Sequence, residues 1–415
     1  MVFRLAPRFP PELTDMVLDC LLDDKAALST TSLVCRSWLS RSRLHLFRHL
    51  SVANDFISFA AFLQNTPYLR TYVKYLVLHG HLDDHSTTSP SCAPTTVFLE
   101  PIVLSDILSH LPSLHTLQLH AVAFHGRSSP CPSPSFKLNE LIMMNVGSLQ
   151  DTTSDMLNIL SLFTDVHHLH IGSTTQTLDA DDIPSQTVDL PIPHSLRVSS
   201  LKLEDVPLDL YLQLIRQTES VKTLQELEVD CMGLEDAEAL SALLHETNSN
   251  IGRLAINLSQ CPSDGIYSGE EDSEDLVTLT SRAICENISA SVSSCTNLSA
   301  LEIAISLDSY LEDPSTYPDA WDWLSSILHS APSSSLQQID ISLAAEESFA
   351  PLLELNVPWQ PLADVLNKFS NLGRVTVANM PPTSWCFSEE EKDVVRRNLP
   401  ELVQRGLLHV GSWRI

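Results

Sequence analysis

The sequence predicts an α/β protein in two parts: a small unit of three helices, followed by a long run of parallel strands with helices covering one side. Three observations support this prediction. One short apolar pattern returns along the chain after residue 50, helical apolar spacing lies between its copies, and the charge balance changes near residue 50. Because 43% of the 415 residues are hydrophobic and only 18% are charged, the chain can bury large cores and should be mainly globular.

Residues 10–47 are predicted to form three short helices. Pro10 and Pro11 suit a first helical turn, where a missing N–H and a fixed φ are tolerated. The apolar residues that follow recur at helical spacing on one stripe: Leu13, Val17, Cys20 and Leu21. Asp24 can cap a second helix, and a third should run from Cys35 to Phe47. So small a unit buries little surface, and apolar residues left on its outside are expected to contact a partner.

Charge separates this unit from the rest of the chain. Residues 1–50 contain seven Lys or Arg and five Asp or Glu, whereas the whole chain has 24 against 52 and a net charge of −28. This shift predicts two domains, 1–50 and 51–415. A surface this acidic repels phosphate backbones, so nucleic acid is not an expected partner.

After residue 50 the repeated pattern is an apolar residue, two others, and then apolar, any, apolar. Its copies lie 24 to 47 residues apart, which is typical of a repeat protein. The expected strands are VKYLVL (73–78), LHTLQL (114–119), LNELIM (138–143), VHHLHI (166–171), VSSLKL (198–203), LQELEV (224–229), IGRLAI (251–256), LSALEI (298–303), LQQIDI (336–341), LGRVTV (372–377) and RGLLHV (405–410).

Helical apolar stripes lie between several of these strands. They occupy residues 104–111, 208–215 and 359–366, and Ser388 with Glu391 forms a capping-box pattern before another helix. Strands that alternate with helices pair in parallel, so each repeat buries its face only against its neighbours.

The chain lacks the marks of a membrane or secreted protein. No apolar run is long enough to span a bilayer, and the N-terminus does not resemble a signal peptide. Nine cysteines without a CxxC pair predict reduced thiols. We therefore expect an intracellular protein, cytoplasmic or nuclear, with no membrane partner.

Motifs of catalysis are also missing. The sequence has no HExxH, GxSxG, GxxxxGK[ST] or GxGxxG pattern. His168 and His170 should point to the same face of a strand and could be two metal ligands, but no third ligand is dictated by spacing, and an exposed polar pair is the simpler interpretation. We expect no enzyme, no metal and no cofactor, with a hydrolase built on His and carboxylate groups as a remote alternative.

The helical unit contains a motif made by Pro10, Glu12, Leu13, Val17, Leu21, Leu33, Val34, Cys35 and Trp38. These residues resemble an F-box, whose pattern is Leu-Pro-x-Glu-Leu, an apolar stripe, and then Val-Cys-x-x-Trp. The chain departs at Phe9, where the family usually has Leu. The resemblance implies docking of a Skp-type adaptor, and through it a cullin, by Phe9, Pro10, Leu13, Val17, Leu21, Leu33, Val34, Cys35 and Trp38. The alternative is a helical cap that closes the N-terminal end of the repeats.

The repeated Leu-x-x-Leu-x-Leu pattern resembles leucine-rich repeats. That family commonly places Asn or Cys three residues after the last strand leucine, where the side chain links adjacent turns. This chain has apolar residues there instead: Val122, Val146, Val206, Met232 and Met380. The resemblance therefore implies an irregular leucine-rich-repeat-like solenoid, and loops are expected at 80–96, 125–135, 173–195 and 264–275.

Strand alternation predicts which residues line the inner, concave face. One column between the buried pairs should run Val77, Gln118, Ile142, His170, Lys202, Glu228, Ala255, Glu302, Asp340, Thr376 and His409. The predicted substrate-binding residues on this face are His168, His170, Glu204, Glu226, Glu228, Asp230, Glu302 and Asp340. The expected function is a substrate-recognition adaptor of a Skp–cullin–F-box ubiquitin ligase that holds an unidentified, basic protein substrate. The alternative is an acidic repeat scaffold that binds a basic protein without any role in ubiquitin transfer.

Overall fold

A computed structural model describes residues 10–80, 98–124, 136–148, 152–173, 193–247, 249–259, 274–306, 318–344, 359–379 and 387–412. The chain divides into two compact units, residues 1–193 and 194–415. The expected loops at 80–96, 125–135, 173–195 and 264–275 lie outside the described residues, apart from their ends.

The first unit begins with the three predicted helices: α1 (Pro11–Asp19), α2 (Lys25–Ser32) and α3 (Arg36–Arg48). The Asp24 carboxylate accepts a hydrogen bond from the backbone N–H of Ala27 at 2.8 Å, which confirms the predicted cap of α2. Both α1 and α2 pack against α3, and Leu18 and Leu28 are fully buried.

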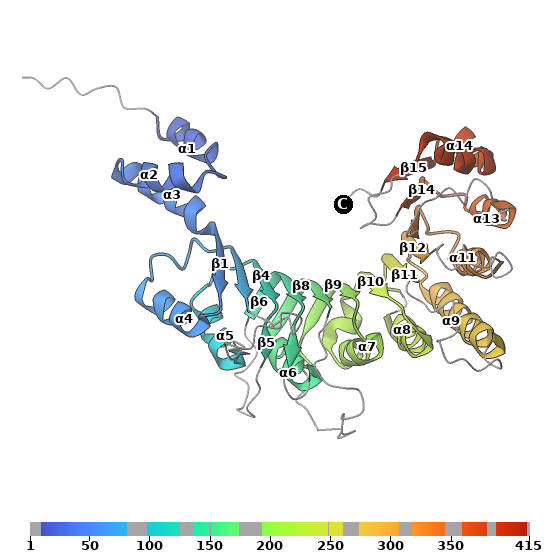
Figure 1. The fold of residues 1–415 in the computed structure, drawn as a ribbon, viewed down its shortest axis with the longest axis horizontal. Coiled ribbons are helices and arrows are strands. Elements are labelled where there is room, and N and C mark those ends of the chain that lie inside the picture. The colour runs from blue at the N-terminus through green and yellow to red at the C-terminus, as the bar shows by residue number, and fades with distance from the viewer. Residues whose placement is uncertain are drawn as a thin grey trace, which may run out of the picture. The chain divides into compact units, whose positions relative to one another are not determined.

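A strand that the sequence pattern missed follows α3 directly, so residue 50 lies inside a strand. The parallel strands of the first unit pair in the order β1 (His49–Ala53), β2 (Tyr75–His79), β4 (Thr116–His120), β6 (Phe136–Met144) and β8 (Phe163–Gly172). One side of this sheet carries the helices α4 (Phe56–Asn65), α5 (Pro101–Ser109) and α6 (Thr152–Leu160) (Figure 1). A second, short sheet pairs β3 (Phe98–Leu99), β5 (Ala123–Phe124) and β7 (Gly147–Ser148).

The second unit repeats the strand–helix alternation. Its parallel strands pair in the order β9 (Arg197–Glu204), β10 (Glu226–Asp230), β11 (Arg253–Asn257), β12 (Ala300–Ser306), β13 (Gln338–Ala344), β14 (Arg374–Asn379) and β15 (Leu408–Ser412). The helices that line one side are α7 (Leu208–Arg216), the 3-10 helix η2 (Glu219–Lys222), α8 (Leu234–Thr247), α9 (Glu274–Ser294), α11 (Pro318–Ser330), α13 (Trp359–Leu366), α14 (Glu389–Asn398) and α15 (Pro400–Gln404) (Figure 1). The predicted capping box of Ser388 and Glu391 is present at α14.

Two residues of each repeated pattern point toward the helices and form the core. Leu408 and Val410 of the last strand, β15, are only half-buried, whereas from β9 to β14 these residues are at most 1% exposed: Leu201, Leu203, Leu227, Val229, Leu254, Ile256, Leu301, Ile303, Ile339, Ile341, Val375 and Val377. Strand register aligns them into two continuous rows. Each strand from β9 to β14 therefore buries its apolar pair in a core that it shares with its neighbours.

Backbone hydrogen bonds link neighbouring strands at the strand ends. A residue with positive φ follows five strands: Asn54, Ala121, Asn145, Ser173 and Asp205. In the first unit the N–H at this place bonds the last carbonyl of the next strand, as Ala121 does to Met144 at 3.0 Å. Gly80 follows β2 and makes the same bond to His120. The apolar Val122, Val146 and Val206 are then buried beneath this turn.

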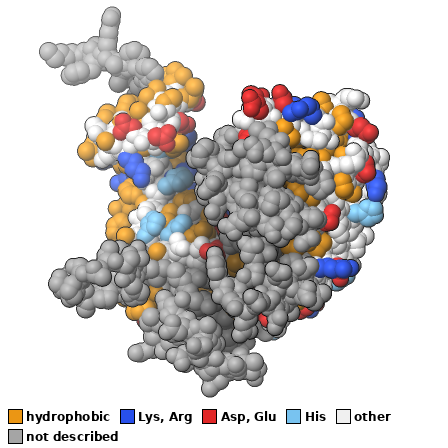
Figure 2. Space-filling model, turned by 45° about the vertical axis from the view of Figure 1, so that its right-hand side comes forward, with side chains coloured by type: hydrophobic (Ala, Val, Ile, Leu, Met, Phe, Trp, Pro, Cys, Tyr) orange, Lys and Arg blue, Asp and Glu red, His pale blue; other side chains and the backbone are white. Residues whose placement is uncertain are grey.

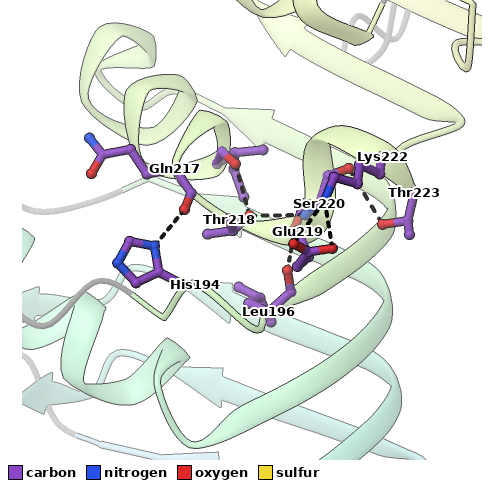
Figure 3. Close-up of polar contacts among 9 residues, drawn as sticks. His194, Leu196, Gln217, Thr218, Glu219, Ser220, Lys222 and Thr223 are labelled. Atoms are coloured by element: carbon purple, nitrogen blue, oxygen red, sulfur yellow. Dashed lines mark hydrogen bonds and ion pairs between the residues drawn. The ribbon is translucent and has the colours of Figure 1, made fainter.

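A cluster of polar side chains fixes the start of the second unit (Figure 3). The buried Ser220 hydroxyl donates to the Leu196 carbonyl at 3.0 Å and accepts from the Val198 N–H at 3.1 Å. The ring of His194 bonds the Gln217 carbonyl at 3.0 Å, joining the entry to β9 with the end of α7. These bonds satisfy backbone groups at the start of β9 and at the end of α7, so we assign the cluster a structural role.

Candidate functional site

The three N-terminal helices expose an unusual amount of apolar surface. We use the name helical docking face for six exposed apolar residues of α1 and of the segments that follow α1 and α2. Their exposed fractions are Leu13 46%, Met16 62%, Val17 52%, Leu22 42%, Leu33 84% and Val34 60%. Hydrophobic atoms dominate much of the surface of this unit (Figure 2). Exposed apolar side chains gathered on so small a unit indicate a protein contact.

The structure places the predicted docking residues unevenly. Phe9 lies outside the described residues, Pro10 and Cys35 are exposed, and Leu21 and Trp38 are half-buried. Leu13, Val17, Leu33 and Val34 belong to the helical docking face. The apolar stripe of α1 thus points mostly outward, and its fully buried residue is Leu18, which the stripe does not include.

An ion-pair cluster joins α1 to α3. The Arg41 guanidinium donates two hydrogen bonds to the Asp19 carboxylate, from Nε and Nη2, each of 2.7 Å. His45 Nε2 lies 2.7 Å from Asp19 Oδ1, and its side chain is only 5% exposed. Hydrogen bonds from Arg41 and then His45 lower the pKa of Asp19 to about 2. This cluster fixes the orientation of α1, which carries half of the helical docking face.

Cys35 stands at the N-cap of α3, next to Leu33 and Val34 of the helical docking face. Its thiol lies 3.0 Å from the Ser37 hydroxyl. Hydrogen bonds from this hydroxyl and from the Trp38 backbone lower the pKa of the exposed Cys35 thiol.

We call the face of each parallel sheet that lies opposite its helices the free sheet face. In the second unit, strand register aligns the residues of the predicted column on this face. The register partners run Lys202, Glu228, Ala255, Glu302, Asp340, Thr376 and His409, as strand alternation predicted. A parallel sheet with helices on one side presents these positions on its other side.

The carboxylates of this column are partly neutralised by two basic side chains, Lys202 within the column and Arg253 in the row beside it. Lys202 Nζ lies 3.0 Å from Glu228 and 3.3 Å from Glu204, and Arg253 lies 3.4 Å from Glu302. Burial alone would lower the pKa of Lys202, but the two carboxylates outweigh burial and raise it. The pairs Lys202–Glu228 and Arg253–Glu302 bridge neighbouring strands, so part of the charge of these carboxylates is neutralised within the sheet.

Three of the carboxylates predicted to bind substrate are partly or largely buried: Glu302, Asp340 and Asp230. Burial and the neighbouring Glu228 raise the pKa of Glu302 to about 7, against the opposing effect of Arg253. Asp340 is only 8% exposed and accepts a hydrogen bond from the Gln338 amide.

The side chain of Asp230, at the end of β10, stabilises the turn that follows β9. It accepts bonds from the Asn257 amide at 2.9 Å and from the backbone N–H of Asp205 at 3.0 Å. In the first unit, the N–H of the residue after a strand donates to the last backbone carbonyl of the next strand. At the end of β9, the Asp230 carboxylate accepts this bond from Asp205 in place of a backbone carbonyl. Glu226, in contrast, is exposed and accepts a bond from the Ser200 hydroxyl at 3.1 Å.

On the first unit, the free sheet face is rich in histidine. We call five side chains of β1, β2, β4 and β8 the histidine face: His49, His79, His120, His168 and His170. His79 and His120 are register partners with stacked rings whose centroids are 5.5 Å apart. His168 and His170 thus have further imidazoles on the same face, but no three His, Cys, Asp or Glu side chains among the described residues are grouped as a metal site requires.

Comparisons with known proteins do not assign this chain to a family. No model of a protein family matches the chain, and none of the curated proteins matches it. Among the helices of the described residues, none has the length and apolarity needed to cross a bilayer.

Sequence reasoning missed the Asp19, Arg41 and His45 cluster. Arg41 and His45 lie four residues apart within the predicted third helix. Their i, i+4 spacing does place both on one helical face, and that spacing was the available signal. The acidic partner comes from another helix, which spacing cannot identify.

Proposed function

We propose that this protein is a substrate-recognition adaptor of a Skp–cullin–F-box ubiquitin ligase. The observation that supports this proposal is the helical docking face, where Leu33 and Val34 are 84% and 60% exposed. Val34 begins the family's Val-Cys-x-x-Trp motif and Leu33 directly precedes it, and Leu13 of the first motif and Val17 of the apolar stripe are exposed on α1. Side chains of this kind gain free energy when a partner removes them from water, at about 25 cal/mol per Å² of apolar surface.

In this proposal the chain carries out no chemistry. Its N-terminal helices bind a Skp-type adaptor inside the cell, and through it a cullin, while the repeats hold a protein substrate. The contribution to ubiquitin transfer is a high effective concentration and a fixed orientation of the substrate.

Purified proteins test adaptor docking. We expect Leu33→Asp and Val34→Asp to fold normally, because both side chains already lie in solvent. Both should weaken binding of a Skp-type adaptor by more than about 100-fold in calorimetry, since an unpaired carboxylate buried in an interface costs several kcal/mol. Ile57→Asp is the matched control, because Ile57 is 73% exposed on α4, outside the helical docking face. Wild-type protein that does not bind the adaptor, or variants that bind like wild type, would refute the proposal.

The proposed substrate surface is the free sheet face of the second unit. Glu226 and Glu228 remain accessible there; Glu204 shares the ion-pair partner Lys202 with Glu228, and Glu302 lies two strands away on β12. Such a surface attracts a basic segment and accelerates its association more than it tightens the complex. Because Lys202 and Arg253 already neutralise part of it, we expect only a moderate dependence on salt.

Glu226→Lys combined with Glu228→Lys tests this surface, and Asp230 is left unchanged because it holds the turn at Asp205. Slower association of a basic substrate at low salt is the expected result. Unchanged association would place recognition elsewhere.

The second candidate is a repeat scaffold that binds a basic protein without ubiquitin transfer. The same carboxylates favour it, and only adaptor docking separates the two functions. A chain that binds basic partners through Glu226 and Glu228 but never binds the adaptor would be such a scaffold.

A further inference from the structure

The free sheet face of the first unit is formed by three short rows of register partners. One row is His49, Tyr75, Thr116, Glu140 and His168, and the next is Ser51, Val77, Gln118, Ile142 and His170. The third row is Ala53, His79, His120, Met144 and Gly172. Five of these fifteen described positions are histidine.

The charges on this face differ from those of the whole chain. Among its fifteen positions Glu140 is the only carboxylate, and none is Lys or Arg. Glu140 accepts a hydrogen bond from the Thr116 hydroxyl at 3.2 Å. Arg48 and Lys25 lie close enough to lower the pKa of His49, after the larger effect of its burial. The face is therefore nearly neutral when its imidazoles are neutral and becomes cationic when they bind protons.

The imidazoles on β2, β4 and β8 influence one another. The rings of His79 and His120 stack at 5.5 Å, and His120 Nε2 lies 3.2 Å from Gln118 Oε1. Burial, followed by the charges of His79 and His170, lowers the pKa of His120. Each proton added to this face thus makes the next one less favourable, unless negative charge comes from outside.

We propose that the histidine face binds an acidic segment of a partner protein, and that binding takes up protons. Carboxylates of the segment accept hydrogen bonds from the imidazoles and supply the negative charge that the face lacks. Val77, Ile142 and Met144 lie between the imidazoles and provide apolar contacts for an extended chain. This surface is separate from the helical docking face and from Glu226 and Glu228, so the inference does not depend on the proposed adaptor function.

Thermodynamic linkage fixes the direction of the pH dependence. A bound carboxylate raises the pKa of an imidazole, so the complex holds more protons than the free protein. The affinity for the acidic segment must then increase as the pH falls through the pKa values that the imidazoles have in the bound and in the free protein. Each imidazole whose pKa rises by about one unit contributes up to about tenfold in affinity.

Fluorescence anisotropy with the full chain tests this inference. The probe is a labelled peptide of about twelve residues, rich in Asp and Glu and free of phosphate, because an extended peptide of that length covers a sheet of this width. At constant ionic strength we expect binding at least about tenfold tighter near pH 6 than near pH 8. Equal affinity at both pH values would overturn the inference, as would tighter binding of an RNA oligomer than of the peptide.

Substitution identifies the groups responsible. The triple variant His79→Gln, His120→Gln and His170→Gln should lose most of the pH dependence, because only His49 and His168 of the histidine face remain. His245→Gln should keep it, because His245 is an exposed residue of α8 in the second unit. If the triple variant does not fold, His79→Gln alone should still reduce the pH dependence, since His79 is exposed at the end of β2. Imidazole proton resonances give a second measurement, and the peptide should raise their titration midpoints. Midpoints that do not move, or a pH dependence retained in these variants, would refute the assignment.

Discussion

Gly80 occupies a strand end that has no room for a side chain. A Cβ atom added there would lie 2.1 Å from the carbonyl oxygen of Ala121 and 2.8 Å from the Cα of Val122. Both neighbours are backbone atoms, so they cannot move away by changing a rotamer. The Gly80 N–H also donates to the His120 carbonyl at 2.9 Å, which fixes the same turn from the other side.

The cost of Gly80→Ala follows from these contacts. Overpacking of this kind costs about 1–3 kcal/mol, and loss of the bond to His120 adds about 1 kcal/mol. We therefore expect Gly80→Ala to destabilise the first unit by about 2–4 kcal/mol, or roughly 5–12 °C in its unfolding temperature for a unit of this size. Scanning calorimetry measures this change, and hydrogen exchange should place it in β2 and β4.

Gly233→Ala is the matched control. No atom lies within 4 Å of a Cβ added at Gly233, and its φ is not in the positive range, so the change should be within about 1 kcal/mol of neutral. Equal unfolding temperatures for wild type and Gly80→Ala would show that the turn is not closely packed and that the argument for this strand end is wrong.

Three further predictions concern the core and two titrating groups. Leu227→Ala should lower the free energy of unfolding by about 2–5 kcal/mol, because Leu227 is only 1% exposed between its register partners. Hydrogen exchange should then increase in β9 and β11 as well as in β10, and an increase confined to β10 would contradict a shared core. The pKa of Asp19 is lowered to about 2 in the folded state, so its pairing stabilises the N-terminal helices above about pH 4 and is lost as the pH falls toward 2. Amide exchange of α1 should show this loss, and Asp19→Asn should abolish the acid dependence at a cost of about 1 kcal/mol near neutral pH, given solvent screening. The pKa of Glu302 is raised to about 7 when folded, so ionisation destabilises the native state as the pH rises from about 4.5 through 7. Glu302→Gln should therefore add about 1–3 kcal/mol of stability in urea unfolding near pH 8 and little near pH 5, and an equal effect at both would be inconsistent with this assignment.

Local patterns predicted much of the repeat architecture. The eleven predicted strands all appear, within a few residues of the predicted bounds, and the caps at Asp24 and Ser388 are present. These features depend on residues close together in the chain, so periodicity and capping chemistry are sufficient to find them. The column from Lys202 to His409 was also predictable, because each repeat carries the same offset between its buried pair and its exposed residues.

The strand β1 shows where periodicity fails. It has only five residues, His49–Ala53, and follows α3 without a turn signal. Its assignment depends on pairing with β2, which begins 26 residues after it.

The sequence by itself determined the alternation of strand and helix, the buried pairs and the positions available on the free sheet face, because each follows from spacing within a single element. Only the tertiary structure decided what those positions do. It turned the apolar stripe of α1 outward, since Asp19 is held by Arg41 and His45, 22 and 26 residues away. It neutralised part of the acidic column by placing Lys202 and Arg253 beside carboxylates of neighbouring strands, and it stacked His79 on His120. Each of these contacts joins elements distant in the chain, and the free energy of such contacts depends on distance and burial that only packing sets.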